Sequence, residues 1–208
     1  INTLKKMGYE NEIINYLYYK NPNYRSERLS APLIKISVKN NLKDFALKWL
    51  DKYSAFKYPK LARVRKKRFD GFHKKYTAVS KLYKSYSELY NASMKYETYI
   101  VGSDQVWNPN NGTNIAPYFL TFAPKDANKV SYASSFGVGS VDSAYYPQYK
   151  DWLNNLTHIS TREADGVNII KEVTGKDALH VVDPTLLLTK EDWQEIMVPY
   201  EAKEPYIL

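Results

Sequence analysis

The sequence of 208 residues contains no cysteine, and this absence excludes several chemistries. Disulfide bonds, zinc sites built from thiolates and a cysteine nucleophile are all ruled out, and the composition is typical of a reducing compartment. We therefore expect a cytoplasmic protein. No apolar run approaches the roughly 18 residues that a membrane-spanning helix requires, so we expect the chain to be soluble.

Histidines are also few, and their spacing does not indicate a metal site. His73, His158 and His180 show no short spacing such as H-x-x-x-H. No serine lies in a G-x-S-x-G turn. Segment 134–139 lacks both the third glycine of a dinucleotide-binding loop and a P-loop lysine. We expect no metal and no cofactor, and the sequence shows no complete catalytic apparatus.

Charge is distributed very unevenly along the chain. Residues 1–95 contain 22 Lys and Arg against 7 Asp and Glu, whereas residues 96–208 contain 8 against 15. Nine basic residues lie between Lys57 and Lys75, where Asp70 is the single acidic residue. Such a segment indicates an anionic neighbour, namely a phosphate, an acidic polymer, a nucleic acid or a membrane surface. Solvated lysines on helix faces explain the same excess equally well.

The first half combines an incomplete opening with a helical segment. Residues 1–8 are typical of a helix end closed by a glycine, so we expect sequence upstream. Residues 9–18 are rich in β-branched and aromatic side chains and predict a short strand. Apolar residues then recur at helical spacing over 41–53, with Trp49 expected to be buried, and a second helix is predicted from Pro59 to Tyr76. We interpret residues 31–93 as a helical basic insertion.

The second half alternates strands and helices. Short apolar runs at 98–101, 130–133, 157–160 and 179–182 predict strands, and helices are predicted over 145–155 and 163–174. This alternation is typical of an α/β fold with a parallel sheet covered on both faces. Thr189 resembles the N-cap of a further helix, with Asp192 at its third position. Residues 205–208 indicate the first strand of another domain.

Polar residues follow each predicted strand, at the edge where open parallel sheets bind ligands. After the first strand come Ser103, Asp104 and Gln105, which offer donors and acceptors, although Asp104 could instead cap a helix. Trp107, just beyond them, could be a platform for a sugar or part of the core. Ser135 follows the second strand in a segment of small residues, which can bring backbone N–H groups against an anion. A plain flexible loop explains that segment equally well.

An arginine and an aspartate follow the last two strands. Arg162 lies at a strand-to-helix junction, where its planar guanidinium could bind a carboxylate or phosphate through two hydrogen bonds. The alternative is a local ion pair with Glu163 or Asp165. Asp183 precedes a proline that ends the strand, so its carboxylate either contacts a ligand or caps the following turn.

Five segments together resemble the polysaccharide pyruvyl transferase family in order and spacing. They are YIVGSDQVWN (99–108), YFL (118–120), SYASSFG (131–137), ISTRE (159–163) and VDPTLL (182–187). LKKMGY (4–9) and IINY (13–16) are similar to the end of the family's first helix and its second strand. The resemblance is loose between residues 26 and 93.

The resemblance implies the front half of a larger enzyme. The chain would be an N-terminal Rossmann-like domain, incomplete at both ends, of a two-domain enzyme of the GT-B type. The donor would be phosphoenolpyruvate and the acceptor a sugar, which a lipid could carry. A catalytic histidine and further donor contacts would lie in a C-terminal domain outside these 208 residues, so we expect no turnover from them alone. Arg162 would contact the donor, and Ser103 and Asp104 the acceptor.

Two other functions remain open from the sequence. A nucleotide-sugar glycosyltransferase shares the two-domain architecture and would bind a nucleoside diphosphate. A non-enzymatic binder of acidic polymers would use residues 57–75, where Tyr58, Phe69 and Tyr76 could stack on bases. We expect no nucleic-acid partner, and we expect the basic helices to contact the inner face of a membrane if the acceptor is lipid-linked.

Overall fold

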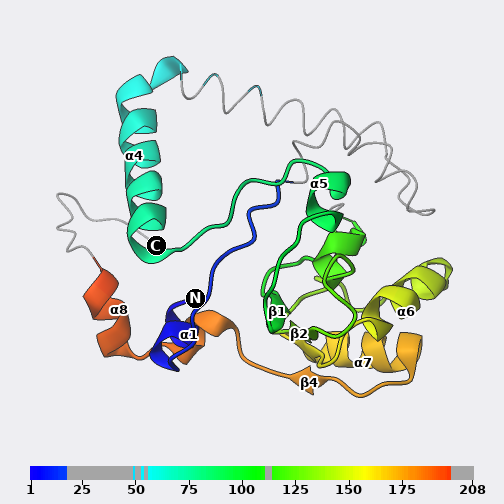
Figure 1. The fold of residues 1–208 in the computed structure, drawn as a ribbon. Coiled ribbons are helices and arrows are strands. Elements are labelled where there is room, and N and C mark those ends of the chain that lie inside the picture. Colours follow the sequence, from blue (N-terminus) through cyan, green and yellow to red (C-terminus); the bar gives the residue numbers. More distant parts are fainter. Residues whose placement is uncertain (18–48, 50–52, 54–55, 111–113, 198–208) are drawn as a thin grey trace.

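The structure is a computed structural model and describes residues 1–17, 49, 53, 56–110 and 114–197. It confirms a mixed α/β fold with a small parallel sheet and flanking helices (Figure 1). The strands are β1 (Thr98–Val101), β2 (Asn128–Ser131), β3 (Ser160–Thr161) and β4 (Leu179–His180). The α-helices are α1 (Asn2–Lys6), α4 (Pro59–Tyr76), α5 (Tyr86–Tyr90), α6 (Tyr146–Asn154), α7 (Ala164–Thr174) and α8 (Lys190–Ile196). Three 3-10 helices are η2 (Ala116–Phe119), η3 (Ser143–Tyr145) and η4 (Pro184–Leu187).

The sheet is parallel and follows the order of the chain. β1 pairs with β2 in a register that sets Thr98 opposite Asn128, and β3 pairs with β4. Isolated parallel bridges, Val130 with His158 and Ser134 with Thr161, join the two pairs. The strands therefore lie in the order β1-β2-β3-β4, so that their carboxyl ends meet at one edge.

Buried hydroxyl groups replace part of the regular ladder between β2 and β3. The Oγ atom of Ser131 donates to the carbonyl oxygen of Ser160 (3.0 Å) and accepts from its backbone N–H (2.9 Å). The Ser160 Oγ donates in turn to the carbonyl oxygen of Ser131 (2.7 Å). Both side chains are almost fully buried, so each hydroxyl satisfies the other strand's backbone where water cannot.

An aromatic cluster forms the centre of the core beside this sheet. Trp107 is fully buried and stacks on Phe119, with ring centroids 5.3 Å apart and planes 9° apart. Phe119 also packs on Trp152 of α6, and Tyr149 donates from its hydroxyl to the carbonyl oxygen of Trp107 (2.7 Å). Of the two interpretations of Trp107, the structure therefore supports the core residue and not a sugar platform.

One face of the sheet is covered and the other is partly open among the described residues. Tyr99 and Val101 point into the core, where α6 and α7 pack against each other. Ile100 and, further along, Leu179 point the other way and are exposed. We expected both faces of the sheet to be covered. Among the described residues, only one face is.

The helix ends follow their sequence signals closely. α7 stops at Gly175, whose φ of 76° is the left-handed conformation that glycine adopts without strain. α8 begins at Thr189, which forms the expected reciprocal capping box with Asp192. α4 begins at Pro59, where a missing N–H costs no hydrogen bond.

Two predictions in the first half were wrong. Residues 9–18 do not form a strand in the described part; Ile13 and Tyr16 make isolated parallel bridges to Val79 and Tyr83. Trp49 is 59% exposed and its ring stacks on Tyr53, although the helical spacing predicted its burial. Periodicity identifies an apolar face, but it does not show that another element covers it. Residues 205–208 and most of 31–55 lie outside the described residues.

Across the described residues, the structure contains no helix that is both long and apolar enough to span a bilayer.

Candidate functional site

Three loops meet at the carboxyl edge of the sheet. The backbone N–H of Ser135, after β2, donates to the carbonyl oxygen of Asp104, after β1 (3.1 Å). The N–H of Arg162, after β3, donates to the carbonyl oxygen of Ser134 (3.3 Å). The sequence predicted that these segments share one edge, and the structure confirms that placement.

A chain of side-chain contacts crosses this edge from β2 to β4. The hydroxyl of Ser135 donates to Oε1 of Glu163 (2.9 Å), and the same oxygen accepts from Nε of Arg162 (2.9 Å). Nη1 of Arg162 then donates to Oδ2 of Asp183 (3.2 Å). Arg162 is thus held between two carboxylates, with 30% of its side chain exposed. We call Ser135, Glu163, Arg162 and Asp183 the edge cluster.

The structure shows the local contact that was considered for each of the two charged residues: an ion pair for Arg162 and a cap for Asp183. Arg162 forms the expected pair with Glu163, and also one with Asp183 that the sequence did not predict. Asp183 caps η4, because its Oδ1 accepts from the backbone N–H (2.9 Å) and the hydroxyl (2.7 Å) of Thr185. These contacts fix how both side chains lie at the edge without testing whether either binds a ligand.

Hydrogen bonding stabilises the charged forms of Asp183 and Arg162 in the edge cluster. The N–H and hydroxyl of Thr185, with a smaller contribution from Arg162, hold the pKa of Asp183 below its usual value. Hydrogen bonding to Glu163, opposed by burial and supported by Asp183, raises the pKa of Arg162. Arg162 therefore remains a cation and Asp183 an anion at neutral pH.

We expect Thr185→Val to raise the pKa of Asp183, because one donor to its carboxylate is lost. A lowered pKa contributes stability above the ordinary aspartate value of about 3.9, and this contribution is lost as the pH falls through the folded-state pKa. An NMR titration of the Asp183 carboxyl carbon measures the shift. Thr189→Val, which removes the cap of α8 but no donor to Asp183, should leave that pKa unchanged. An identical titration curve for Thr185→Val would contradict the assigned cause.

The loop after β1 contains the other predicted residues. Asp104 and Gln105 are exposed and Ser103 is half-buried. Oδ1 of Asp104 accepts from the N–H of Gln105 (2.7 Å), so it stabilises a turn and caps no helix. Oε1 of Gln105 accepts from Asn108 (2.9 Å). The structure brings this loop to the edge cluster through backbone contacts to Ser135, with Asp104 facing solvent.

A glycine allows the close approach of this loop to β2. Gly102 has a φ of 138°, which side-chain-bearing residues rarely adopt, and a Cβ built on it would lie 1.9 Å from the carbonyl oxygen of Tyr132. Any side chain there must push the loop after β1 away from the segment after β2. Gly102 therefore holds Ser103 and Asp104 beside Ser135.

Gly102→Ala should lower the free energy of unfolding by about 3 kcal/mol or more, because backbone strain and the clash with Tyr132 act together. The matched control is Gly71→Ala, in the middle of α4, where no atom outside the helix's own backbone lies within 4 Å of the built Cβ. There alanine should stabilise by up to about 1 kcal/mol. Urea unfolding of the two variants gives the comparison, and similar midpoints for both would refute the steric argument.

Sequence reasoning missed two contributors to the site. Glu163 was considered as a local partner of Arg162, but its link to Ser135 across the sheet was not predicted. His180 was assigned no role, yet its Nε2 lies 3.0 Å from the carbonyl oxygen of Arg162. Both contacts depend on the register between neighbouring strands, which the sequence alone does not give.

The edge cluster has the chemistry of an anion or hydroxyl site rather than a metal site. Among the described residues, no group of three or more His, Asp or Glu side chains is arranged to hold a metal ion. One partly exposed guanidinium can bind an anion, while carboxylates and hydroxyls accept from or donate to the hydroxyls of a sugar.

Comparison with known proteins identifies a family. The family model described as polysaccharide pyruvyl transferase matches residues 1–207, essentially the whole chain. No curated protein and no solved structure matches it.

Proposed function

Because this chain belongs to the polysaccharide pyruvyl transferase family, we propose that it transfers a pyruvyl group from phosphoenolpyruvate to a sugar. Two hydroxyls of the acceptor would become the oxygens of a pyruvate ketal. The acceptor would be a unit of a cell-surface polysaccharide or exopolysaccharide. The family match supports a transferase, and the edge cluster supports the choice of an anionic donor and a hydroxyl-bearing acceptor.

The proposed reaction requires a proton, two hydroxyls and a leaving phosphate. Protonation of the enol methylene turns it into a methyl group and makes the adjacent carbon electrophilic. One sugar hydroxyl adds to that carbon and loses its proton, and the carbon–oxygen bond to phosphate breaks. The second hydroxyl then adds to the same carbon and loses its proton, which closes the ketal. Of the two hydroxyl protons released, one balances the proton taken up by the methylene and the other leaves on the phosphate.

The proposed binding of the donor rests on Arg162. Phosphoenolpyruvate bears a carboxylate and a phosphate, and a guanidinium matches the geometry of either group through two parallel hydrogen bonds. Glu163 occupies Nε and Asp183 occupies Nη1, and neither residue binds Nη2 among the described contacts. The donor would bind Nη2 and displace Asp183 from Nη1. Glu163 would keep the guanidinium oriented.

The remaining residues at this edge would contact the acceptor or hold Glu163 in place. Asp104 and Ser103 would contact acceptor hydroxyls, with Gln105 beside them. Ser135 is buried, so it would act by holding Glu163 rather than by reaching the substrate. Asp183, once released by Arg162, would accept a hydrogen bond from the sugar. The carboxylates suit hydroxyl donors.

We propose further that the enzyme has the two-domain GT-B architecture and works in the cytoplasm. The catalytic histidine and additional donor contacts would face the edge cluster from the second domain. The 208 residues alone would then bind donor weakly and show no turnover.

The test is phosphoenolpyruvate-dependent release of phosphate by the full-length protein in the presence of candidate glycans. Mass spectrometry of the glycan should show the added ketal, a gain of one pyruvate less one water. Binding of phosphoenolpyruvate and of a nucleoside diphosphate should be titrated in parallel. Tight binding of the nucleotide with none of phosphoenolpyruvate would contradict this proposal and favour a nucleotide-sugar glycosyltransferase.

A further inference from the structure

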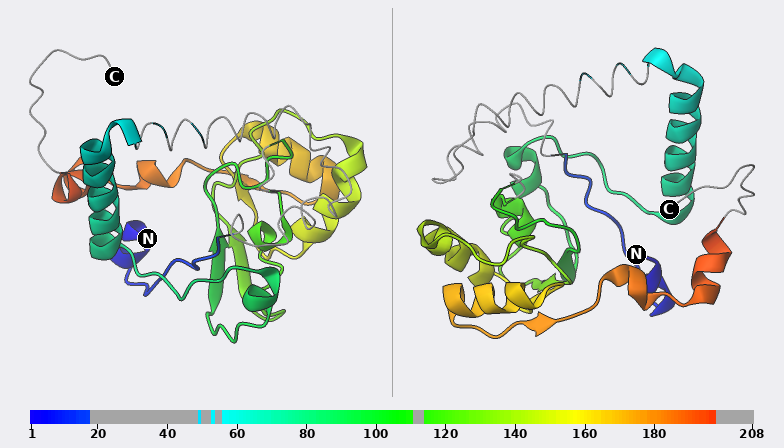
Figure 2. Two further views of the ribbon diagram at one scale, coloured as in Figure 1. Left: turned by 90° about the horizontal axis from the view of Figure 1, so that it is seen from above. Right: turned by 180° about the vertical axis from the view of Figure 1, so that it is seen from behind.

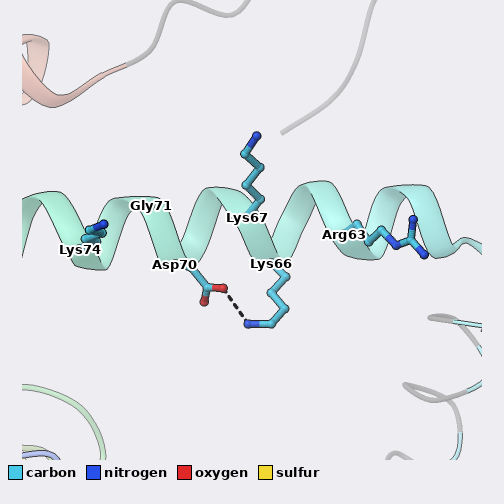
Figure 3. A pocket seen from close by; sticks show the side chains of 6 residues that line it. All are labelled: Arg63, Lys66, Lys67, Asp70, Gly71 and Lys74. Atoms are coloured by element: carbon cyan, nitrogen blue, oxygen red, sulfur yellow. Dashed lines mark hydrogen bonds and ion pairs between the residues drawn. The ribbon is translucent and has the colours of Figure 1, made fainter.

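Helix α4 has a basic face formed by residues one turn apart. Figure 3 shows Arg63, Lys66, Lys67 and Lys74 around a shallow hollow that Gly71 leaves open. Asp70 pairs with Lys66 (2.6 Å), and among the described residues it is the single acidic partner on the helix. Arg63, Lys67 and Lys74 therefore keep uncompensated positive charge on this face.

The opposite face of α4 carries exposed apolar side chains, with Arg65 and Arg68 between them. The helical repeat places Leu61, Phe69, Phe72 and Tyr76 away from the basic hollow. Phe72 packs on Tyr76 with centroids 4.9 Å apart, and the guanidinium of Arg65 lies 5.9 Å from the ring of Phe69. Leu61 is 68% exposed and Phe69 58%, so the described part of the chain does not bury this face.

More aromatic rings precede the helix. Trp49, Tyr53, Phe56 and Tyr58 are all exposed, and the first two stack with centroids 5.6 Å apart. Rings of tryptophan and tyrosine have an apolar body and a polar edge, which suits the boundary between water and lipid. These aromatic residues, together with the apolar and the basic face of α4, form the surface that we call the α4 surface.

α4 stands apart from the α/β core in every view (Figures 1 and 2). None of its residues is buried, and its C-terminal carbonyl at Tyr76 accepts a hydrogen bond from Lys5 (3.3 Å). The helix is amphipathic and 18 residues long, yet too polar to cross a bilayer. A basic polar face opposite an apolar aromatic face is typical of helices that lie in the membrane interface.

We infer that the α4 surface docks the protein onto a bilayer containing anionic phospholipids. The apolar face enters the boundary between headgroups and acyl chains, and lysine and arginine stems extend outward so that their charges meet lipid phosphates. A nucleic acid offers phosphate but no apolar layer, and would leave the exposed Leu61 without a partner. A bilayer offers phosphates to the basic face of the helix and an apolar layer to its apolar face. This inference rests on α4 and not on the proposed reaction.

The test uses the full chain and vesicles of two compositions. Co-sedimentation should be strong with phosphatidylcholine vesicles containing phosphatidylglycerol and weak with phosphatidylcholine alone. In a Trp193→Phe background, Trp49 is the exposed tryptophan, and its emission should shift to shorter wavelength on anionic vesicles. Equal sedimentation with both compositions would overturn the inference.

Charge reversal tests whether vesicle binding depends on the charges of α4 or only on the net charge of the protein. Arg63→Glu, Lys67→Glu and Lys74→Glu together should weaken the partition coefficient on the order of a hundredfold. The control reverses three exposed lysines elsewhere, Lys125→Glu, Lys150→Glu and Lys176→Glu, and produces the same net charge. Equal losses in the two triple variants would show a general charge effect and overturn the inference.

Loss of the apolar face distinguishes a bilayer from a polyanion. Leu61→Ser with Phe72→Ser should reduce vesicle binding about tenfold or more, because apolar area no longer enters the bilayer. Met7→Ser with Met197→Ser, also exposed, is the matched control and should have little effect. Unchanged vesicle binding in the α4 pair, with single-stranded RNA bound more tightly than vesicles, would replace the bilayer with a nucleic-acid partner.

Discussion

Arg162→Ala should lower kcat/KM for phosphoenolpyruvate on the order of a hundredfold or more in the full-length protein. Each hydrogen bond to a charged group contributes roughly 1.5–3 kcal/mol, and the proposed contact has two. Arg162→Lys should restore little, because an ammonium keeps the charge but loses the planar fork. Steady-state kinetics with varied phosphoenolpyruvate measure the effect.

The folding cost of the same substitution should be small. The side chains of Arg162, Glu163 and Asp183 are all partly exposed, and Thr185 continues to hold Asp183. Partly exposed ion pairs contribute about 1 kcal/mol or less. Lys171→Ala, which breaks the exposed pair with Asp177, provides a matched control with normal kinetics expected. Normal kcat and KM in Arg162→Ala would make Arg162 a structural ion-pair partner.

Trp107→Ala should lower the free energy of unfolding by about 3–5 kcal/mol, a large share of the stability of an ordinary domain. The side chain is fully buried between aromatic rings, and its Nε1 donates to the carbonyl oxygen of Tyr118 (2.8 Å). Truncation leaves a cavity and an unsatisfied carbonyl group. Chemical denaturation followed by circular dichroism measures the loss.

A second tryptophan provides the control for this prediction. Trp193 also donates from Nε1 to a carbonyl oxygen, that of Thr185 (3.3 Å), but its side chain is exposed. Trp193→Ala should therefore cost about 1 kcal/mol or less. If Trp107→Ala kept full stability and lost sugar binding alone, the platform interpretation of Trp107 would replace the core interpretation.

Helix boundaries were predictable because their signals are local. Gly175 ends α7 and Thr189 with Asp192 begins α8, as the sequence indicated, since these residues interact within one turn. The segments that resembled the pyruvyl transferase family were likewise confirmed by the match of the whole chain. Contiguous sequence contained both kinds of information.

Strand limits and burial were less predictable because they depend on distant partners. β2 was expected at 130–133 but ends at Ser131, and Ala133 beyond it has a φ of 52°, unusual for a residue with a side chain. The N–H of Ala133 donates to the hydroxyl of Ser160, a contact between residues 27 positions apart. No local pattern in the sequence indicates this turn.

The candidate site was also predictable in part, in its position but not in its contacts. The order of strands placed Arg162 and Ser135 at one edge, because parallel strands end together. The actual links depend on side-chain reach: Glu163 joins Ser135 to Arg162, and Asp183 reaches Arg162 from the segment after β4. Only coordinates could distinguish these contacts from the alternatives that the sequence left open.

The central core also has a consequence for the order of folding. Every buried member of its hydrophobic cluster lies between Tyr99 and Val173, a continuous stretch of chain. Its strands pair with segments about 20–30 residues away, so each closure brings together only a short length of chain. The ion pair between Lys6 and Asp192, by contrast, joins residues far apart in sequence. We expect the sheet and its edge cluster to assemble first, during synthesis, and α1 to join α8 afterwards.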